Sequence, residues 1–299
     1  MQSTTSAQGY VKDDRNQTVL VYVNGDFVPR DEATVSIFDA GFVLGDGVWE
    51  GLRLVKGHLI SREAHMKRLY EGAKAIGLDI GLSPRELTTV VMRTLERNNM
   101  TDGVHIRLMI TRGRKSTPNQ DPRFAEGRAT IVVIPEYKQP NPESKDTGIT
   151  LMTSTFRCST PDVFDLRLNS HSRLNYILAL TQAIDLGADE ALMLDPRGFV
   201  ASCNSTNFFI IRDEELWTSN GSCCFNGITR ATVMALYRDA GYTVHEKDFT
   251  LAEVYSADEA FVTGTLGGLT PVCRIDGRAI GSGKPGPILA RISGLYENY

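Results

Sequence analysis

The chain has 299 residues, of which 41% are hydrophobic and 23% are charged, and this predicts a globular protein of two domains. Its net charge is only −4, with no dense basic stripe, so the charge pattern does not favour nucleic-acid binding. No run of about 18 apolar residues occurs, and the polar first residues lack the apolar core of a signal peptide. We therefore expect no membrane association and a cytoplasmic location.

The cysteines are odd in number and lack the paired spacings of a zinc site or a disulfide framework. They are Cys158, Cys203, Cys223, Cys224 and Cys273. We expect free thiols and no metal site.

The first half of the chain predicts a small α/β domain over residues 18–135, preceded by a disordered polar tail at 1–17. Residues 19–24 are rich in β-branched side chains and end at Asn24-Gly25, a typical hairpin turn. Residues 45–55 alternate in polarity and meet Lys56-Gly57, which predicts a second hairpin.

Two helices and two strands follow in the same domain. Ser61 caps a helical pattern that reaches Ile76 and carries Arg68. A capping box that begins at Ser83, with proline at the first helical position, predicts a second helix to about Asn98. Strands are predicted at 104–111 and 129–134.

Residues 136–148 contain prolines, lysines and other polar residues without periodicity, as an interdomain linker does. A larger domain is then predicted over 149–299, and no internal repeat is visible. Its expected strands lie near 149–156, 190–195, 207–211, 215–218, 242–246, 259–263 and 271–275. Its expected helices cover 173–186, a segment from Thr229, and the residues after Pro287.

Two short segments of this larger domain are suited to binding a phosphate group. The run Asn226-Gly-Ile-Thr-Arg230 precedes an amphipathic helix, so it presents backbone N–H groups and the Thr229 hydroxyl at a helix N-terminus. Taken alone, Gly-x-Thr before a helix is more often a simple N-cap than a phosphate site. The run Thr263-Gly-Thr-Leu-Gly-Gly268 adds a second turn of small residues directly after a strand, where backbone can approach a ligand.

These segments belong to a longer ordered pattern. It consists of Phe42-Val-Leu-Gly-Asp-Gly-Val-Trp-Glu-Gly-Leu-Arg53, His65-Met-Lys-Arg-Leu69, Asn226–Arg230, Phe261-Val-Thr-Gly-Thr265 and Leu269-Thr-Pro-Val272. In this order the runs resemble the signatures of the branched-chain and D-amino-acid transaminases, which are class IV (fold-type IV) pyridoxal-phosphate aminotransferases. The resemblance spans about residues 19 to 296.

The resemblance implies a two-domain, mixed α/β (α+β) fold-type IV protein. A smaller N-terminal α/β domain would precede a larger C-terminal domain with a β-barrel-like core. The implied activity is amino-group transfer between an amino acid, branched-chain-like or D-configured, and a 2-oxo acid, with pyridoxal 5'-phosphate as cofactor. A homodimer is also implied.

The resemblance also implies roles for individual residues. Arg68 would pair with the cofactor phosphate, Ile228 and Thr229 would donate to it, and Thr265 with Leu266 would close its opposite side. Trp49 would face the substrate, and Arg107 matches an arginine that branched-chain transaminases direct at substrate carboxylates. Each has a plain alternative, such as a solvated helix arginine for Arg68 or a core strand residue for Trp49.

Two positions depart from the family. The family's Schiff-base lysine falls on Asn169, and no lysine occurs between Lys145 and Lys247. The glutamate that holds the pyridine nitrogen falls on Ser202. An amide is not a nucleophile and a hydroxyl does not hold the charge of the ring nitrogen, so both departures predict reduced, altered or absent transamination.

Three interpretations remain open. In the first interpretation, the chain is an aminotransferase-like enzyme that binds pyridoxal phosphate non-covalently, with His171 as a candidate base. Alternatively, it is an inactive homologue that binds this or another phosphorylated ligand. A third interpretation is a diverged enzyme with Cys203 or Ser202 as nucleophile and His171 as base. Arg112 and Arg123 are further candidates for binding a substrate carboxylate.

Overall fold

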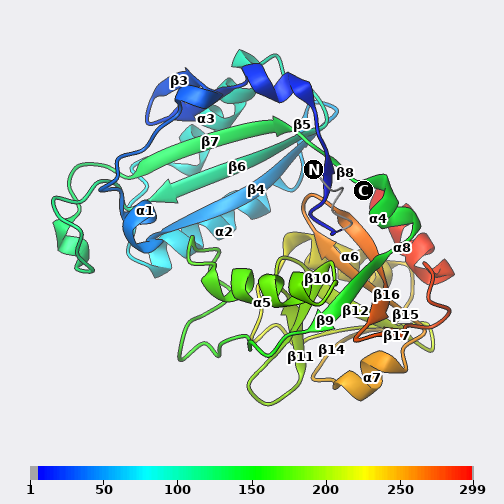
Figure 1. Ribbon diagram of the computed structural model, residues 1–299. Helices are drawn as coiled ribbons and strands as arrows, with labels where there is room; N and C mark the ends of the chain where they lie inside the picture. Colours follow the sequence, from blue (N-terminus) through cyan, green and yellow to red (C-terminus); the bar gives the residue numbers. More distant parts are fainter. Residues whose placement is uncertain (1–5, 298–299) are drawn as a thin grey trace. The chain divides into compact units, whose positions relative to one another are not determined.

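The computed structural model describes residues 6–297 and forms two compact units (Figure 1). The N-terminal unit comprises Lys12–Gln139 and Leu168–Arg173; the C-terminal unit comprises the chain up to Val11, Pro140–Arg167 and the chain from Leu174. The break at Gln139 lies within the segment predicted as a linker. Residues 168–173 were not expected in the N-terminal unit.

The tail predicted at residues 1–17 is structured where the chain is described. Its first five residues lie outside the described part of the chain. Tyr10–Val11 forms strand β1, and Asp14–Thr18 forms a 3-10 helix that is capped by the Asp13 side chain.

The N-terminal unit is built on a six-stranded antiparallel sheet, with strand order β3-β2-β7-β6-β4-β5. The strands are β2 (Leu20–Val23), β3 (Asp26–Pro29), β4 (Gly47–Val55), β5 (His58–Leu59), β6 (Val104–Thr111) and β7 (Thr130–Tyr137). Both predicted hairpins are confirmed. Their turns place Asn24, Gly25, Lys56 and Gly57 at positive φ, the region that glycine and asparagine tolerate best.

Helices α2 (Arg62–Ala75) and α3 (Pro84–Arg97) pack on one face of this sheet (Figure 1). The predicted capping box is confirmed, since Ser83 and Glu86 cap each other at the start of α3. Along β6 every second residue, from Val104 to Ile110, is buried in the core that the helices cover. The residues between them therefore lie on the opposite face of the sheet.

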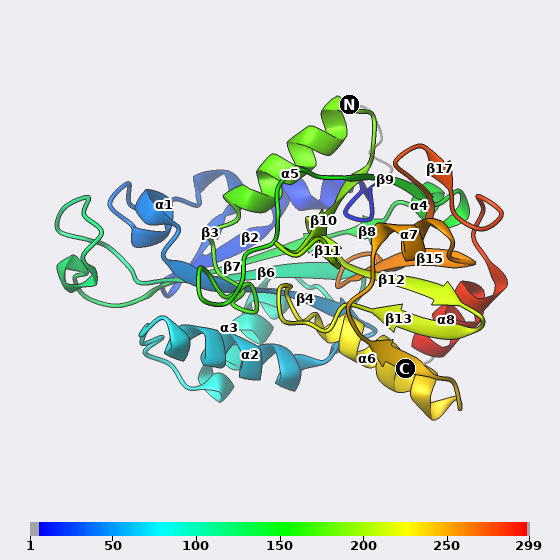
Figure 2. The ribbon, with the colours of Figure 1, turned by 90° about the horizontal axis from the view of Figure 1, so that it is seen from below.

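The C-terminal unit contains a nine-stranded mixed sheet in the order β11-β10-β9-β16-β15-β12-β13-β14, with β17 paired to β16. The strands are β9 (Ile149–Thr153), β10 (Glu190–Leu194), β11 (Val200–Cys203), β12 (Asn207–Arg212), β13 (Glu215–Thr218), β14 (Val244–Glu246), β15 (Glu259–Gly264), β16 (Gly268–Ile275) and β17 (Arg278–Ala279). Figure 2 shows the course of these strands. Aliphatic and aromatic side chains form the core against this sheet.

Three longer helices pack on the outside of this sheet: α5 (Leu174–Asp185), α6 (Ile228–Asp239) and α8 (Pro287–Glu297). The helices expected at 173–186, from Thr229 and after Pro287 are confirmed to within one residue at their starts. Short elements were not predicted, because a few residues carry no period. They are α1 (Ala40–Leu44), α4 (Pro142–Asp146), α7 (Leu251–Tyr255), β8 (Gln139–Pro140), β11, β17, and the 3-10 turns Arg30–Glu32 and Pro122–Phe124.

Within residues 6–297, no helix combines the length and apolar character needed to cross a membrane. All five cysteines are free and buried.

Candidate functional site

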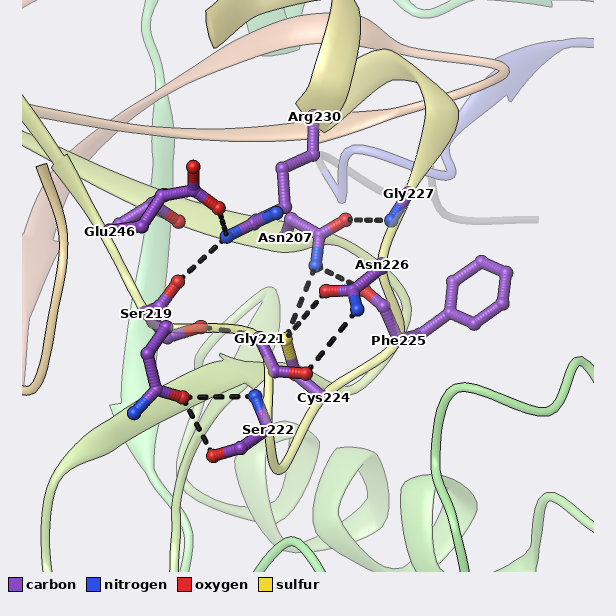
Figure 3. Close-up of polar contacts among 12 residues, drawn as sticks. Asn207, Ser219, Gly221, Ser222, Cys224, Phe225, Asn226, Gly227, Arg230 and Glu246 are labelled. Atoms are coloured by element: carbon purple, nitrogen blue, oxygen red, sulfur yellow. Dashed lines mark hydrogen bonds and ion pairs between the residues drawn. The ribbon is translucent and has the colours of Figure 1, made fainter. Parts of the chain in front are cut away.

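The start of α6 is held in place by one buried side chain, Asn207 at the beginning of β12 (Figure 3). Its Nδ2 donates to the Phe225 carbonyl at 2.6 Å, and its Oδ1 accepts from the Gly227 N–H at 3.1 Å. Gly227 is the N-cap and has no side chain to cap the helix. The N–H groups of Ile228 and Thr229, in the first turn, therefore have no acceptor within the helix and are suited to binding an anion.

Glycine at 227 is required by this arrangement. A Cβ there would lie 2.3 Å from Asn207 Oδ1, far inside van der Waals contact. Arg230, which was expected only as part of the run, is a buried structural residue. Its Nη2 donates to the Ser219 carbonyl at 2.7 Å and pairs with Glu246 at 3.1 Å (Figure 3).

The second predicted turn lies beside the first. Strand register pairs Asn207 with Thr263, so the turn after β15, which contains Thr265 and Leu266, is on the same edge of the sheet as the start of α6. The Thr263 hydroxyl is buried and has no hydrogen-bond partner within the described residues. An orphaned buried hydroxyl is costly unless a ligand or water satisfies it.

The far side of this turn is closed by protein. A Cβ on Gly267 would lie 2.6 Å from the Ala7 carbonyl oxygen, and Lys145 Nζ donates to the carbonyls of Gly267 and Leu269. The Lys145 side chain therefore stabilises this turn.

Ser202, the residue at the predicted glutamate position, reaches the same place. Its Oγ donates to the Thr206 carbonyl at 2.8 Å, and Thr206 packs 3.4 Å from where a Cβ on Gly264 would stand. Thr206 also donates to Glu190 at 2.9 Å. Burial raises the pKa of Glu190 to about 7 although Thr206 and the Ala7 N–H hydrogen-bond to it.

The C-terminal unit therefore brings five predicted cofactor residues together around Thr206 and Asn207. They are Ser202, Ile228, Thr229, Thr265 and Leu266.

The N-terminal unit carries the predicted substrate residues on the sheet face opposite its helices. Register pairs Gly51 of β4 with Arg107 of β6, and Trp49 is the next residue of β4 on that face. The Arg107 guanidinium stacks on the Trp49 ring, with its Cζ 3.3 Å from the ring centroid, and the rings of His105 and Trp49 lie over Gly51, which has no side chain. Trp49 and Arg107 are thus in contact.

Asn169 and Ser170 pair alongside β4 in an antiparallel arrangement. The Trp49 N–H donates to the Asn169 carbonyl at 2.9 Å, the Trp49 indole N–H donates to the Ser170 carbonyl at 3.0 Å, and Val48 pairs with Ser170. The Asn169 amide itself is bonded on both sides: Nδ2 donates to the Trp49 carbonyl at 2.6 Å and Oδ1 accepts from Arg173.

Arg68 makes a bidentate ion pair with Glu50, with both bonds at 2.7 Å. Glu50 lies on β4, on the face toward the helices, and is fully buried; His65 Nδ1 lies 2.7 Å from its second oxygen. Burial opposes ionisation, but hydrogen bonds from Arg68 and His65 lower the pKa of Glu50. Arg68 is therefore held rigidly by a carboxylate that the sequence interpretation did not single out.

The remaining candidates have structural partners. His171 Nε2 lies 3.0 Å from the Val48 carbonyl, which only accepts, so this nitrogen carries the proton; burial also lowers the pKa of the ring. Arg112 pairs with Asp46 and also donates to the carbonyls of Ile76 and Gly77. Arg123 pairs with Asp121 on the surface. Cys203 is buried in the C-terminal core, where burial raises the pKa of its thiol well above the usual range and so disfavours the reactive thiolate.

Comparison with known proteins decides the family. The model of the amino-transferase class IV family matches residues 47–275. The chain belongs to the class IV aminotransferases. Branched-chain-amino-acid aminotransferase-like protein 2 of Arabidopsis thaliana is 40% identical over 94% of this chain and 50% of its own length. The putative branched-chain-amino-acid aminotransferase of Methanocaldococcus jannaschii is 38% identical over 93% of this chain and 95% of its own.

The D-alanine aminotransferase of Listeria monocytogenes is 35% identical over 91% of this chain and 93% of its own length. The class IV chain spans about half the length of its Arabidopsis relatives.

Solved structures confirm the expected fold-type IV architecture of this class IV chain. The Escherichia coli branched-chain amino acid aminotransferase gives a TM-score of 0.88 at 26% identity, covering 94% of both chains. The branched-chain aminotransferase of Thermoproteus uzoniensis, solved with norvaline, gives a TM-score of 0.83 at 30% identity, also covering 94% of both chains. A further branched-chain amino acid aminotransferase, solved with pyridoxamine 5'-phosphate, gives a TM-score of 0.87 at 31% identity, covering 94% of this chain and 93% of that one.

The residues of this class IV chain fit one part of the cofactor and not another. The start of α6 and the orphaned Thr263 hydroxyl suit a phosphate group. The Asn169 amide, bonded to Trp49 and Arg173, cannot form a covalent link to the cofactor, and the Ser202 hydroxyl, bonded to Thr206, is no carboxylate. The residues suit the phosphate, whereas Asn169 and Ser202, at the positions where the resemblance expects the lysine and the glutamate, do not suit the ring.

Sequence reasoning missed the residues that hold this arrangement. Glu50, Arg173, Glu190 and Asn207 are each buried or partly buried and each bonds a predicted site residue or its neighbour. The signal available was a charged or amide residue inside an apolar strand, as for Glu50 among Val48, Leu52 and Leu54. Such a residue needs a partner, but the partner lies far along the chain.

Proposed function

We propose that this class IV chain binds pyridoxal or pyridoxamine 5'-phosphate through its phosphate group, without a covalent link, and that it transfers amino groups between an amino acid and a 2-oxo acid slowly. The observation that supports this proposal is the start of α6, where Asn207 holds Gly227 so that the next N–H groups face outward. When bound, the cofactor supplies the electron sink for amino-group transfer.

The slow rate follows from the residues at 169 and 202. A lysine would accept and return the substrate proton, whereas the Asn169 amide has no basic lone pair and is hydrogen-bonded on both sides. The Nε2–H of His171 donates to the Val48 carbonyl. The neighbouring residue Ser170 pairs with Val48, and these two contacts fix the position of the ring. Arg107 and Trp49 supply the surface that binds the amino acid, which is branched-chain-like or D-configured.

Retention of the cofactor through gel filtration tests the proposal. We expect pyridoxal phosphate to change its absorbance and co-elute with the wild-type chain, pyridoxal without phosphate to separate from it, and borohydride to leave the chain unmodified. Asn207→Ala removes the bonds to Phe225 and Gly227, so the N–H groups that follow Gly227 are no longer held in place for the phosphate. Cofactor binding should weaken about tenfold, because a hydrogen bond to a charged group such as the phosphate is worth about 1.5–3 kcal/mol.

The matched control is Asn119→Ala, a loop asparagine whose side chain accepts a bond from the neighbouring Asp121 N–H. It should bind like wild type. A wild-type chain that retains no cofactor would remove the proposal. Retention with no amino transfer from a mixed amino-acid panel would instead leave the inactive homologue, and native mass spectrometry with phosphorylated metabolites would then identify its ligand.

We also propose that the chain forms a homodimer through α5. Leu174, Ile177 and Ile184 recur on one side of this helix and are 66%, 56% and 60% exposed, while Ala179 and Ala183 pack inward. An exposed apolar face of this size is typical of an interface. Sedimentation velocity should give twice the 33.0 kDa chain mass for wild type and the monomer mass for Ile177→Asp.

The control for the dimer is Val163→Asp, another exposed apolar residue outside the helix. It should leave the dimer intact, and a wild-type monomer at micromolar concentration would contradict the proposal.

Free thiols at all five cysteines support a cytoplasmic location, which fractionation of the source cells would check.

A further inference from the structure

The described chain begins with a short arm, Ser6–Val11, that belongs to the C-terminal unit. Ala7 carries its only buried side chain, whereas Tyr10 and Val11 are about half exposed. One buried methyl group contributes little hydrophobic energy, so hydrogen bonds must hold the N-terminal arm in place. A segment held in this way opens locally at a small cost in free energy.

Two of the bonds that hold the N-terminal arm go to a single carboxyl group. The Ala7 N–H donates to Glu190 Oε1 at 3.1 Å, and the Ser6 hydroxyl donates to the same oxygen at 3.4 Å. On the other side, Ser144 and the Asn141 N–H donate to carbonyls of the arm at 3.3 and 3.0 Å. Glu190 is therefore the ionisable anchor of the arm.

The N-terminal arm also forms the wall behind the turn Gly264–Gly268. A Cβ on Gly267 would lie 2.6 Å from the Ala7 carbonyl oxygen, and one on Gly264 would lie 3.4 Å from the Gln8 amide nitrogen. Both glycines thus leave room for the arm. When the arm lifts away, the turn keeps the bonds from Lys145 but loses this wall.

The surroundings of Glu190 favour its neutral form. Its side chain is fully buried at the start of β10, and burial raises its pKa to about 7 although Thr206 and the arm donate to it. The charge of the adjacent Asp189 acts in the same direction, and the buried Cys203 thiol stays uncharged because burial raises its pKa. Within residues 6–297 no ion pair joins Glu190 to a cation, and Lys145 of α4 donates to carbonyls instead.

Closure of the arm is therefore linked to the proton on Glu190. In the open state, water replaces the donors at Oε1, and the pKa of Glu190 returns toward its ordinary value of 4.5. The closed state, with the raised pKa, binds the proton more tightly. Closure is thus favoured at low pH, and this advantage is lost as the pH rises from the ordinary pKa through the raised one.

We propose that the N-terminal arm is a pH-sensitive strap, which closes on the turn Gly264–Gly268 while Glu190 is protonated and opens as Glu190 ionises. Glu190 is its positioning residue. The inference goes beyond the proposed function, because opening and closing need no ligand.

Hydrogen exchange of the full chain without cofactor tests this inference. Exchange of the arm and of the turn is followed by mass spectrometry at about pH 6 and about pH 8, and each rate is divided by the intrinsic rate at that pH. The corrected opening constant of the arm should rise about tenfold between these two values, because the closed and open states differ in proton affinity. The turn Gly264–Gly268 should lose protection together with the arm.

Glu190→Gln keeps the shape and the acceptor for Ala7 but cannot ionise. The opening constant should stay at its low value at both pH values, a result that a merely damaged core would not give. The matched control is Glu143→Gln, an exposed glutamate on α4, which should retain the tenfold rise.

Gly267→Ala places a Cβ against the Ala7 carbonyl and should open the arm at both pH values. Its control is Gly294→Ala, because a Cβ there meets nothing within 4 Å, and this variant should behave like the wild type.

Three results would overturn the inference: a wild-type arm whose corrected exchange is the same at both pH values, a rise that survives Glu190→Gln, or an arm that opens while the turn stays protected. Each is independent of whether the chain retains pyridoxal phosphate, so failure of the strap and failure of the proposed function are distinguishable.

Discussion

Replacing Asn169 by lysine together with Ser202 by glutamate is expected to produce covalent cofactor attachment and a gain in amino transfer. Lysine at 169 supplies the amine that the Asn169 amide cannot, and glutamate at 202 supplies the charge that the Ser202 hydroxyl cannot. General acid–base catalysis alone contributes about 10²-fold or more, so transfer with a mixed amino-acid panel should rise by at least about that factor. Intact mass spectrometry after borohydride should show one cofactor per chain.

The single variants are the controls. Asn169→Lys alone should attach the cofactor and transfer slowly, and Ser202→Glu alone should attach none. A folded double variant that retains pyridoxal phosphate but is not modified by borohydride would show that position 169 is not where the family has its lysine.

Glu50→Gln is expected to lower the free energy of unfolding by about 3–5 kcal/mol, the largest single effect on stability that we predict. The Glu50 carboxylate is fully buried and accepts two bonds from Arg68 and one contact from His65. Removal of its charge leaves the partly buried Arg68 guanidinium without the Glu50 counter-charge, and breaking a buried pair from one side has this cost. Urea unfolding followed by circular dichroism measures it.

The matched control is Glu63→Gln on the same helix that carries Arg68. The Glu63 side chain is 91% exposed and pairs with Arg62 at 3.5 Å, so the change should cost less than about 1 kcal/mol. Equal stability of Glu50→Gln and Glu63→Gln would contradict the role given to Glu50.

The same ion pair has a predictable dependence on pH. Although burial opposes it, bonds from Arg68 and His65 lower the pKa of Glu50 in the folded chain below the ordinary value of 4.5. The stabilisation is therefore present above the unfolded pKa and is lost as the pH falls through the folded pKa. The gap in stability between wild type and Glu50→Gln should narrow in acid.

The elements that the sequence predicted well are those with a long local pattern. The capping box at Ser83, the turn at Asn24-Gly25 and the helix that follows Gly227 depend on neighbours within a few residues, and each stands where it was expected. Segments such as Leu251–Tyr255 and Pro142–Asp146 are single helical turns, too short for a period to show.

The sequence by itself determined the family, the order of the elements and the run at Asn226–Arg230 that begins α6, because these depend on local patterns. It also placed an amide at 169 and a hydroxyl at 202. Only the tertiary structure decided what these residues bond. Asn169 bonds Trp49 and Arg173, Asn207 bonds Gly227, and Glu50 bonds Arg68, each across strand pairs or helix packing that no local pattern encodes.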